Sequence, residues 1–315
     1  MAIPAVIAYN FFQRRVKALL GEADALTNLA REPESATSIA RSGALEVVVD
    51  AMQRIEWDQD VADHSVTLFE TLAFTPDCAG ALAAEDVVRQ LLAAVKEHAD
   101  SDELAMRSLQ LFITIGEAPG TGPDAIKALG GAGLHRHLIT MLTTHARKKD
   151  LLRVAVQLLT KLASDDALSP QIADLGTHAI IRTARAAADN AELLGELFAL
   201  LGQLAFTEAN LQAIVQHGGI AVIIEAIGAF PEEPELMKRC IQTIDNIAMA
   251  SKEYAAIVIQ QGGRTCIEEL IAVYDDDQEI ADAGKSALLA MSVLESAKKE
   301  EEAQKRVRHK PARPT

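Results

Sequence analysis

The side chains of this chain that could hold a metal or form a catalytic dyad are eight histidines and three cysteines. The only closely spaced histidines are His135 and His137, and side chains two residues apart on a helix point in different directions. A zinc site typically uses ligands four residues apart on a helix or across a turn. Cys78, Cys240 and Cys266 stand alone, without a Cys-x-x-Cys pair, as is typical of thiols in a reducing compartment. The sequence therefore predicts no metal site and no cofactor.

Acidic and glycine-rich segments raise two further kinds of chemistry, calcium binding and phosphate binding. The acidic run 275–279 lacks the alternation and the central glycine of a calcium loop. The glycines of 120–123 and 130–133 follow no predicted strand and precede no Lys-Ser or Lys-Thr pair, so neither segment fits a phosphate-binding loop. No Gly-x-Ser-x-Gly nucleophile elbow occurs. We predict that the protein is not an enzyme and has no small-molecule substrate.

Charge and hydropathy limit the classes of partner. The net charge is −15, but residues 298–315 carry seven Lys or Arg against three Glu, so the rest of the chain carries about −19. An acidic body argues against nucleic acid as the main ligand, because phosphate binding needs a basic face. No apolar run reaches the roughly 18–20 residues that span a bilayer. The basic tail suits an acidic partner, with a solvated chain end as the alternative, and its candidate contacts are Lys305, Arg306, Arg308 and Lys310.

The N-terminal segment is apolar from Met1 to Phe12 and is followed by Arg14, Arg15 and Lys17. A secretory signal places its positive charge before the apolar stretch, so this order does not fit one. We expect a partial first repeat whose helix caps the stack, with Phe11 and Phe12 against the first complete repeat or against a partner. A mitochondrial targeting helix over residues 1–20 is the alternative.

A glycine-marked corner recurs along the chain and indicates the helices that position its side chains. The markers, spaced by 42, 46, 45, 43 and 44 residues, are Gly43, Glu85 (a copy without the glycine), Gly131, Gly176, Gly219 and Gly263. Glycine suits a sharp reversal at a helix end because it adopts positive φ without strain. A period of this size, filled with helix formers, is typical of a stacked helical solenoid.

A second marker keeps the same period. Each repeat closes on a large apolar residue followed by a small one, and the small residues are spaced by 43, 43, 47, 42, 43 and 44. These small residues are Ala30, Ala73, Gly116, Ala163, Ala205, Ala248 and Ser292. With 49% apolar and only 4% aromatic residues, the interior must consist of aliphatic side chains, which favours helix-on-helix packing over a β-sandwich.

The fifth repeat shows how one unit is built. A short first helix runs to the corner at Gly218-Gly219, a second helix follows from Ile220, and a third helix from Glu235 buries a stripe that includes Met237, Cys240 and Ile244. Acidic residues precede the third helix of most repeats, and we expect them to cap its free amides. These acids are Asp58, Asp60, Asp100, Asp102, Asp150, Asp189, Glu232, Glu233 and the residues 275–277.

This three-helix unit resembles the armadillo repeat, whose third helix closes on Leu-x-Asn-Leu-Ala; the best matches are residues 26–30 and 244–248. HEAT repeats, with two helices and usually no glycine corner, are the alternative. The resemblance implies an all-α, right-handed armadillo-type α-solenoid of about six repeats. We predict a capping helix or partial repeat at 1–31, a solenoid at 32–294 and a charged tail at 295–315. The predicted repeats are 32–74, 75–117, 118–164, 165–206, 207–249 and 250–294.

In armadillo proteins the third helices line a concave groove that binds extended peptides or helices of partners. Import adaptors of this family place Trp four residues before the groove Asn, whereas the matching positions here are Asp24, Thr67, Gln110, Gln157, Ala199 and Gln242. The catenin type lines its groove with Lys and Arg, and only Lys161 offers that here. The resemblance thus leaves a polar ladder as the candidate partner site: Asn28, Thr67, Thr71, Gln110, Thr114, Gln157, Lys161, Gln203, Gln242 and Asn246. Amide and hydroxyl groups can hydrogen-bond to a peptide backbone, so we expect the ladder to contact a partner. The alternative is that these are merely exposed polar positions and that the partner contacts lie elsewhere.

The sequence therefore favours a protein-binding scaffold or adaptor in the cytoplasm. The alternative is a structural subunit of a large assembly, either in the ciliary axoneme, where armadillo proteins serve as building blocks, or in a mitochondrial complex. The partners in either case are proteins, bound as an extended peptide, a helix or a neighbouring subunit.

Overall fold

The computed structural model describes residues 20–55 and 58–292, and throughout these ranges the secondary structure is helical, without a strand. Contacts divide the chain into two compact units, residues 1–169 and 170–315. Several sequence predictions lie outside the described residues: those for Phe11, Phe12, Lys305, Arg306, Arg308 and Lys310.

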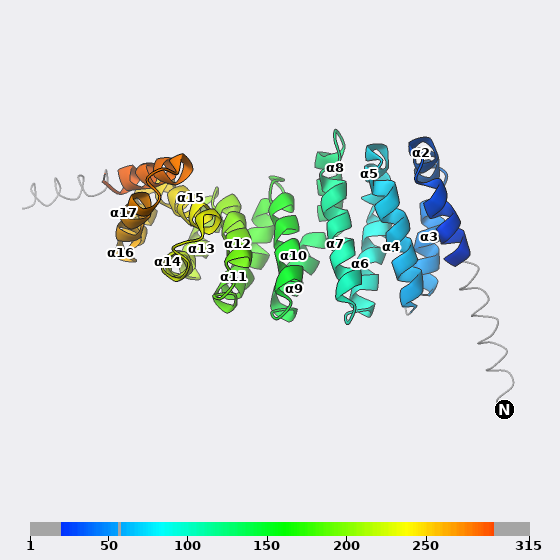
Figure 1. The fold of residues 1–315 in the computed structure, drawn as a ribbon, viewed down its shortest axis with the longest axis horizontal. Helices are drawn as coiled ribbons and strands as arrows, with labels where there is room; N and C mark the ends of the chain where they lie inside the picture. Colours follow the sequence, from blue (N-terminus) through cyan, green and yellow to red (C-terminus); the bar gives the residue numbers. More distant parts are fainter. Residues whose placement is uncertain (1–19, 56–57, 293–315) are drawn as a thin grey trace, which may run out of the picture. The chain divides into compact units, whose positions relative to one another are not determined.

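Unit 1 stacks helices side by side (Figure 1). It opens with a helical stretch at 20–29, and each following repeat adds a first, a second and a third helix. In chain order these are α2 (Pro33–Arg41), α3 (Ala44–Arg54), α4 (Gln59–Ala73), η1 (Pro76–Cys78), α5 (Ala79–Leu82), α6 (Glu85–Glu97), α7 (Asp102–Gly116), α8 (Gly122–Gly131), α9 (Leu134–Thr144) and α10 (Lys149–Leu162). The third helices α4, α7 and α10 pack against one another in sequence.

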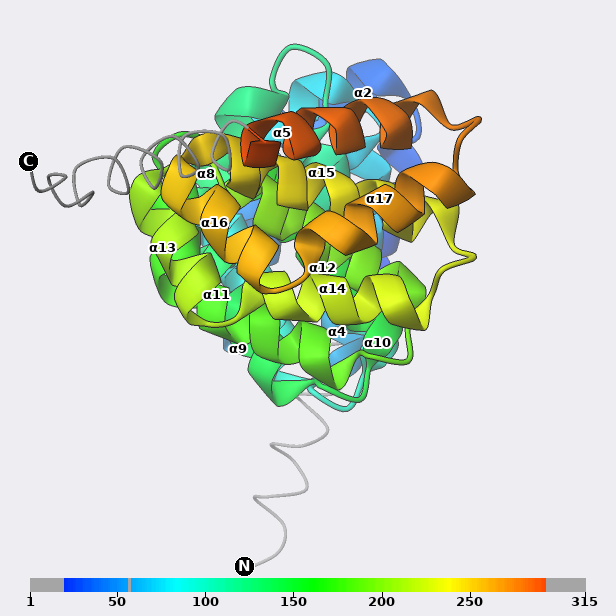
Figure 2. The same ribbon diagram turned by 90° about the vertical axis from the view of Figure 1, so that its left-hand side faces the viewer.

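Unit 2 repeats the same plan. Its elements are α11 (Ser169–Ala186), α12 (Ala191–Leu204), α13 (Glu208–Gln216), α14 (Gly219–Ala229), α15 (Pro234–Ala250), α16 (Lys252–Gln260), α17 (Gly263–Val273) and a helical stretch at 278–292. Figure 2 shows α16 and α17 meeting at an angle. The third helices α12 and α15 pack directly on each other.

Glycines in the left-handed conformation form four of the predicted corners. Gly43, Gly133, Gly218 and Gly262 have φ between 80° and 87°, and each immediately precedes a second helix. A side chain is strained at such a φ, which explains why glycine recurs at this place. The left-handed residue of the third corner is Gly133, two residues after the marker Gly131.

The corner predicted at Gly176 is wrong. Residues 169–186 form the single helix α11, and Gly176 lies buried within it. The Thr177 hydroxyl donates to the carbonyl of Ala173 at 2.6 Å, as in an uninterrupted helix. First and second helices are therefore fused in this repeat.

The capping prediction holds for only part of the acidic residues. Asp58 accepts from the Val61 amide, and Asp277 accepts from the amides of Glu279 and Ile280. The side-chain caps of α7 and α12 are instead the neutral Ser101 and Asn190, each beside a predicted acid, and Lys148 and Glu233 give α10 and α15 no side-chain cap.

The core is made mostly of aliphatic side chains, but the prediction of a wholly aliphatic interior is wrong, because Phe69, Phe112 and Phe198 of α4, α7 and α12 are fully buried in it. In α15 the predicted inward stripe is confirmed, because Met237, Cys240 and Ile244 are each fully buried. Burial alone raises the pKa of the Cys240 thiol far above its usual value, so this cysteine is an inert core residue. The opposite side of each third helix is left to carry the polar ladder.

Candidate functional site: the third-helix face

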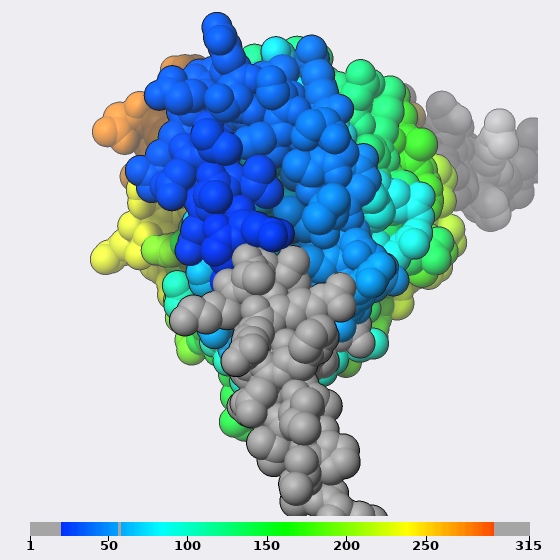
Figure 3. All heavy atoms as spheres, turned by 90° about the vertical axis from the view of Figure 1, so that its right-hand side faces the viewer, coloured from blue at the N-terminus to red at the C-terminus, as the bar shows by residue number. Residues whose placement is uncertain are grey.

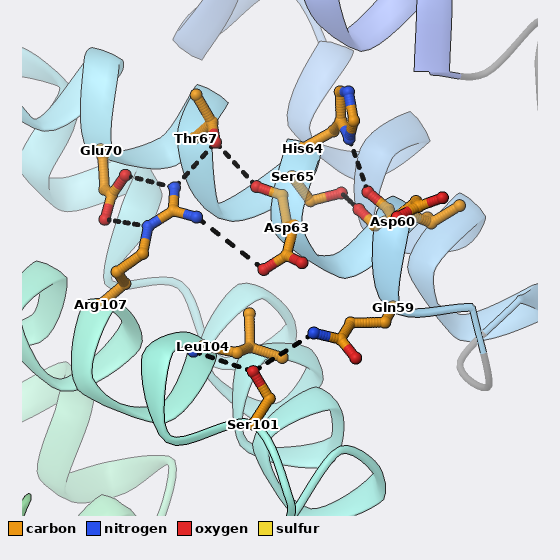
Figure 4. A network of polar contacts seen from close by, with 11 residues as sticks. Gln59, Asp60, Asp63, His64, Ser65, Thr67, Glu70, Ser101, Leu104 and Arg107 are labelled. Atoms are coloured by element: carbon orange, nitrogen blue, oxygen red, sulfur yellow. Dashed lines mark hydrogen bonds and ion pairs between the residues drawn. The ribbon is translucent and has the colours of Figure 1, made fainter.

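In unit 1 one arginine connects two of the third helices that form this face, α4 and α7 (Figure 4). Arg107 on α7 donates from Nε and Nη2 to the two carboxylate oxygens of Glu70 on α4, at 3.1 and 2.6 Å. Nη2 also donates to the Thr67 hydroxyl at 2.7 Å, and Nη1 lies 3.8 Å from the Asp63 carboxylate. The hydrogen bonds that Arg107 donates to Glu70 raise the pKa of Arg107, which is charged in any case. Arg107 thus ties two consecutive repeats.

Ladder hydroxyls in unit 1 are already used as donors. Thr67 donates to the Asp63 carbonyl, Thr71 to the Thr67 carbonyl and Thr114 to the Gln110 carbonyl. Each hydroxyl has one hydrogen, so an incoming ligand would find these groups as acceptors only. Lys161 is half-buried and pairs with Glu117 at 2.5 Å, which makes it a second tie between repeats.

The side-chain amides of the ladder differ in exposure. Gln110 on α7 is exposed, and Gln157 on α10 is half-buried. In unit 2 Gln242 on α15 is exposed and Gln203 on α12 is half-buried. Exposed amides can both donate to and accept from a peptide backbone, so Gln110 and Gln242 are the ladder positions best suited to contact a partner.

Asn246, the groove asparagine of the best-matching repeat, is committed to the protein itself. Its amide donates to the Gly202 carbonyl of α12 at 3.3 Å, and the side chain is half-buried. Asn28 at the other end of the ladder is exposed on the helical stretch 20–29. Within unit 1, Thr67, Thr71, Gln110, Thr114, Gln157 and Lys161 lie on the adjoining helices α4, α7 and α10, and within unit 2, Gln203, Gln242 and Asn246 lie on α12 and α15.

Exposed apolar side chains extend the ladder, and the sequence analysis missed them. Phe74, Phe206 and Met249 are 85%, 72% and 59% exposed. Each directly follows the small residue that ends its repeat, three positions after Thr71, Gln203 or Asn246. Met249 lies in the last turn of α15, whereas Phe74 and Phe206 come just after the ends of α4 and α12. A search for apolar residues at this fixed position after the closing pair would have found them.

The end face of unit 1 is also partly apolar. Figure 3 views this face, formed by the stretch 20–29 and the helices that follow. Leu29 and Val47 are exposed, and Val47 lines a small apolar hollow together with Leu26 and Val48. Leu29 occupies the place that Leu72 and Ile115 fill in later repeats, where both are fully buried by a neighbouring helix layer.

No protein-family model matches the chain, and no curated protein matches it significantly. Solved structures do. An engineered protein from a structural genomics consortium is 21% identical with a TM-score of 0.69, and the match covers 86% of this chain but only 64% of that one. A designed armadillo repeat protein in complex with a (KR)4 peptide is 16% identical with a TM-score of 0.65, over 78% of this chain and 99% of that one.

A chain from a study of a phosphorylation switch in the interaction between cadherin and β-catenin is 11% identical, with a TM-score of 0.61 over 82% of this chain and 56% of that one. The chain has the armadillo-type repeat fold. At these identities the likeness concerns the fold alone, and it favours armadillo over HEAT repeats, in agreement with the three-helix units and glycine corners.

Among the described residues, no group of three or more His, Cys, Asp or Glu side chains is arranged to hold a metal ion. Over the same residues, no single helix is long and apolar enough to span a membrane, and α13 with α14 passes that test only as a pair bent by 62°.

Proposed function

We propose that this protein is a non-catalytic scaffold or adaptor that binds other proteins through its third-helix face. The observation that carries the proposal is the combination of exposed amides with exposed apolar side chains on this face. Gln110 and Gln242 are exposed, and Phe74, Phe206 and Met249 stand at the ends of third helices. Amides fit the backbone of an extended peptide, and large apolar side chains supply the buried area on which affinity depends.

The solved structures of similar fold support a peptide ligand. One is a designed armadillo repeat protein with a (KR)4 peptide, and another comes from work on the interaction between cadherin and β-catenin. The ladder lacks the tryptophans of the import adaptors. It also lacks the cationic lining of the catenins, because Arg107 and Lys161 are paired with acids of the chain itself. We infer a partner held by backbone hydrogen bonds and apolar anchors. The non-catalytic character rests on the sequence, in which no catalytic motif occurs.

The test compares two triple variants of the full chain. A partner is first identified by affinity purification and mass spectrometry from the native source, and its affinity for the recombinant protein is then measured by calorimetry. Replacing Gln110, Gln157 and Gln242 with Ala is expected to weaken binding by tenfold or more, on the order of 1.4 kcal/mol. The matched control replaces the exposed Gln53, Gln216 and Gln260, which lie on first and second helices. Equal affinity of the ladder variant and wild type would refute the proposal.

A structural subunit of a large assembly is the second candidate, and the exposed Leu29 and Val47 at the end of unit 1 favour it. Apolar side chains left open at the end of a stack suit permanent docking to a neighbouring subunit. The apparent mass of the protein in native extract separates the two candidate functions. A free adaptor elutes as a monomer, whereas a subunit co-purifies in a stable complex of high mass.

We propose the cytoplasm as the location of an adaptor, and the ciliary axoneme or a mitochondrial complex as the location of a subunit. Phe11, Phe12 and the basic residues of 305–310 are proposed as additional partner contacts. Fluorescence microscopy of the full chain and of a chain lacking residues 1–20 separates a targeting helix from a structural one.

A further inference from the structure

A cavity of about 400 Å³ lies in unit 1 among α6, α7, α9 and α10. This volume is within the range of small-molecule sites, which is roughly 300–1,000 Å³. Part of its wall is apolar, from Val95, Met141 and Leu151. The remainder is polar and rich in cationic and titratable groups, namely Lys96, Asp102, His137, His145 and Lys148. The cavity uses the second helices and the first turns of third helices, and it contains none of the ladder residues.

Positive charge dominates the polar part of the wall. Lys148 donates to the Ala99 carbonyl at 3.2 Å and pairs with Asp102, the one carboxylate of the lining, at 2.5 Å. No ion-pair partner of Lys96 is found among the described residues. Helix α10 begins beside Lys148 without a side-chain cap, so its first amides add positive potential.

Two histidines of the lining, His137 and His145, have lowered pKa values. Burial, then His145 and then Lys96, lower the pKa of His137. Burial and Lys148 lower the pKa of His145, and Asp102 opposes them. The Nε2 atom of His137 is buried and has no hydrogen-bond partner among the described residues. A buried polar atom without a partner is costly, and a bound ligand would satisfy it.

We propose that this cavity binds a small phosphate monoester, with the phosphoryl group against Lys96, Lys148 and His137 and its apolar body against Val95, Met141 and Leu151. A phosphate dianion complements two ammonium groups better than a single carboxylate does, and it can accept from an imidazole N–H. The threonine hydroxyls of the lining are not the recognition groups, because Thr140 and Thr144 already donate to helix carbonyls. The ester is a ligand and not a substrate.

The proposal is tested by NMR titration of the full chain with phenyl phosphate, following the histidine ring signals. His137 and His145 are expected to shift, while His178 and His217 of unit 2 serve as internal controls. The dissociation constant is expected at about 1 mM or below, with inorganic phosphate binding about tenfold more weakly and phenol not at all.

Two variants separate recognition from structure. Lys96→Met removes an exposed cation and is expected to weaken phenyl phosphate binding about tenfold. Asp102→Asn releases Lys148 from its ion pair and is expected to tighten binding several-fold, a gain that general loss of structure cannot produce. The proposal is overturned if phenyl phosphate leaves the His137 signal in place, or if Asp102→Asn binds no more tightly than wild type.

Discussion

The two units connect their repeats with different chemistry. In unit 1 three cations reach acids of the preceding repeat: Arg107 to Glu70, Lys148 to Asp102 and Lys161 to Glu117. In unit 2 most of the connecting groups are neutral donors: Asn246 to the Gly202 carbonyl, Tyr254 to Glu208, Tyr274 to the Pro231 carbonyl, and Thr243 to the Phe198 carbonyl. The one hydroxyl hydrogen of Thr243 is shared between Phe198 and the Arg239 carbonyl of its own helix. Two cations are exceptions in unit 2: Lys238 pairs with Asp277, and Arg185 donates to the His217 carbonyl.

One position in the repeat distinguishes α4 of unit 1 from α12 of unit 2. Three residues before the small residue that closes the third helix stand Glu70 in α4 and Gly202 in α12. A Cβ atom on Gly202 would lie 3.2 Å from the Thr243 hydroxyl of α15, so the absence of a side chain allows this close approach. Thr243 in turn stands where other repeats have a leucine, such as Leu68 in α4. The contact of α12 with α15 in unit 2 therefore relies on close packing, whereas the contact of α4 with α7 in unit 1 uses long charged side chains.

The largest effect is expected from filling the space that glycine leaves. Gly202→Leu should destabilise unit 2 by about 3 kcal/mol, because overpacking forces neighbouring helices apart. Gly195→Leu on the same helix is the matched control, since a Cβ there meets nothing within 4 Å, and leucine is the better helix former. Native-state hydrogen exchange of the α12 and α15 amides measures the change locally, as a repeat array requires. Equal protection in the two variants would contradict the close-packing argument.

The contrast between predicted and observed corners shows what the sequence could give. At Gly43, Gly133, Gly218 and Gly262 the helical pattern restarts after the glycine, and the corner forms. Across Gly176 the buried residues continue at helical spacing, through Ile172, Gly176 and Ile180, so one helix is the better solution. The repeat period can be predicted because the same residue types recur at each helix end. The fusion of the first and second helices into α11 cannot be predicted from Gly176 alone, because it depends on the buried residues on both sides of this glycine.

The site was less predictable than the fold. The ladder positions follow from the repeat alone, but which amides remain open depends on partners about 40 residues away, such as Gly202 for Asn246. The bond from Arg107 to Glu70 likewise requires two side chains from different repeats to reach each other, and no spacing within a repeat encodes it. Exposed apolar residues such as Phe74 could have been found from their fixed place in the repeat.

A smaller effect should separate the two kinds of connection by their response to salt. Arg107→Met is expected to weaken the contact of α7 with α4 by about 1 kcal/mol at low ionic strength, and by less in concentrated NaCl, which screens a partly exposed ion pair. Thr243→Val removes a buried hydroxyl donor and is expected to cost about 1 kcal/mol at either salt concentration. Hydrogen exchange of α4 and α15 at the two salt concentrations is the measurement. A salt-dependent effect of Thr243→Val would remove the distinction between the units.

The smallest expected effect on stability comes from Asp245 of unit 2, which lacks the cationic partner that Glu70 has in unit 1. Asp245 on α15 stands at the repeat position of Glu70, but its Oδ1 atom is buried and has no hydrogen-bond partner among the described residues. Burial raises the pKa of Asp245 above its ordinary value, and a hydrogen bond with Ser286 only partly opposes this. The folded state therefore holds the Asp245 proton more tightly than the unfolded state, so this group favours folding at low pH, and the benefit is lost as pH rises through the raised pKa.

Asp245→Asn should accordingly stabilise unit 2 at pH 7, by no more than about 0.5 kcal/mol because the half-exposed charge is screened. The gain should shrink toward zero as pH falls to 3.8, where the carboxyl of the unfolded chain also takes up its proton. Glu70→Gln is the contrasting variant, and it should destabilise unit 1 at pH 7 because Arg107 loses its ionic partner. Hydrogen exchange of α15 and α4 at the two pH values gives both differences. If Asp245→Asn instead destabilises unit 2 at pH 7, the carboxylate has a stabilising contact and the two repeat positions are equivalent after all.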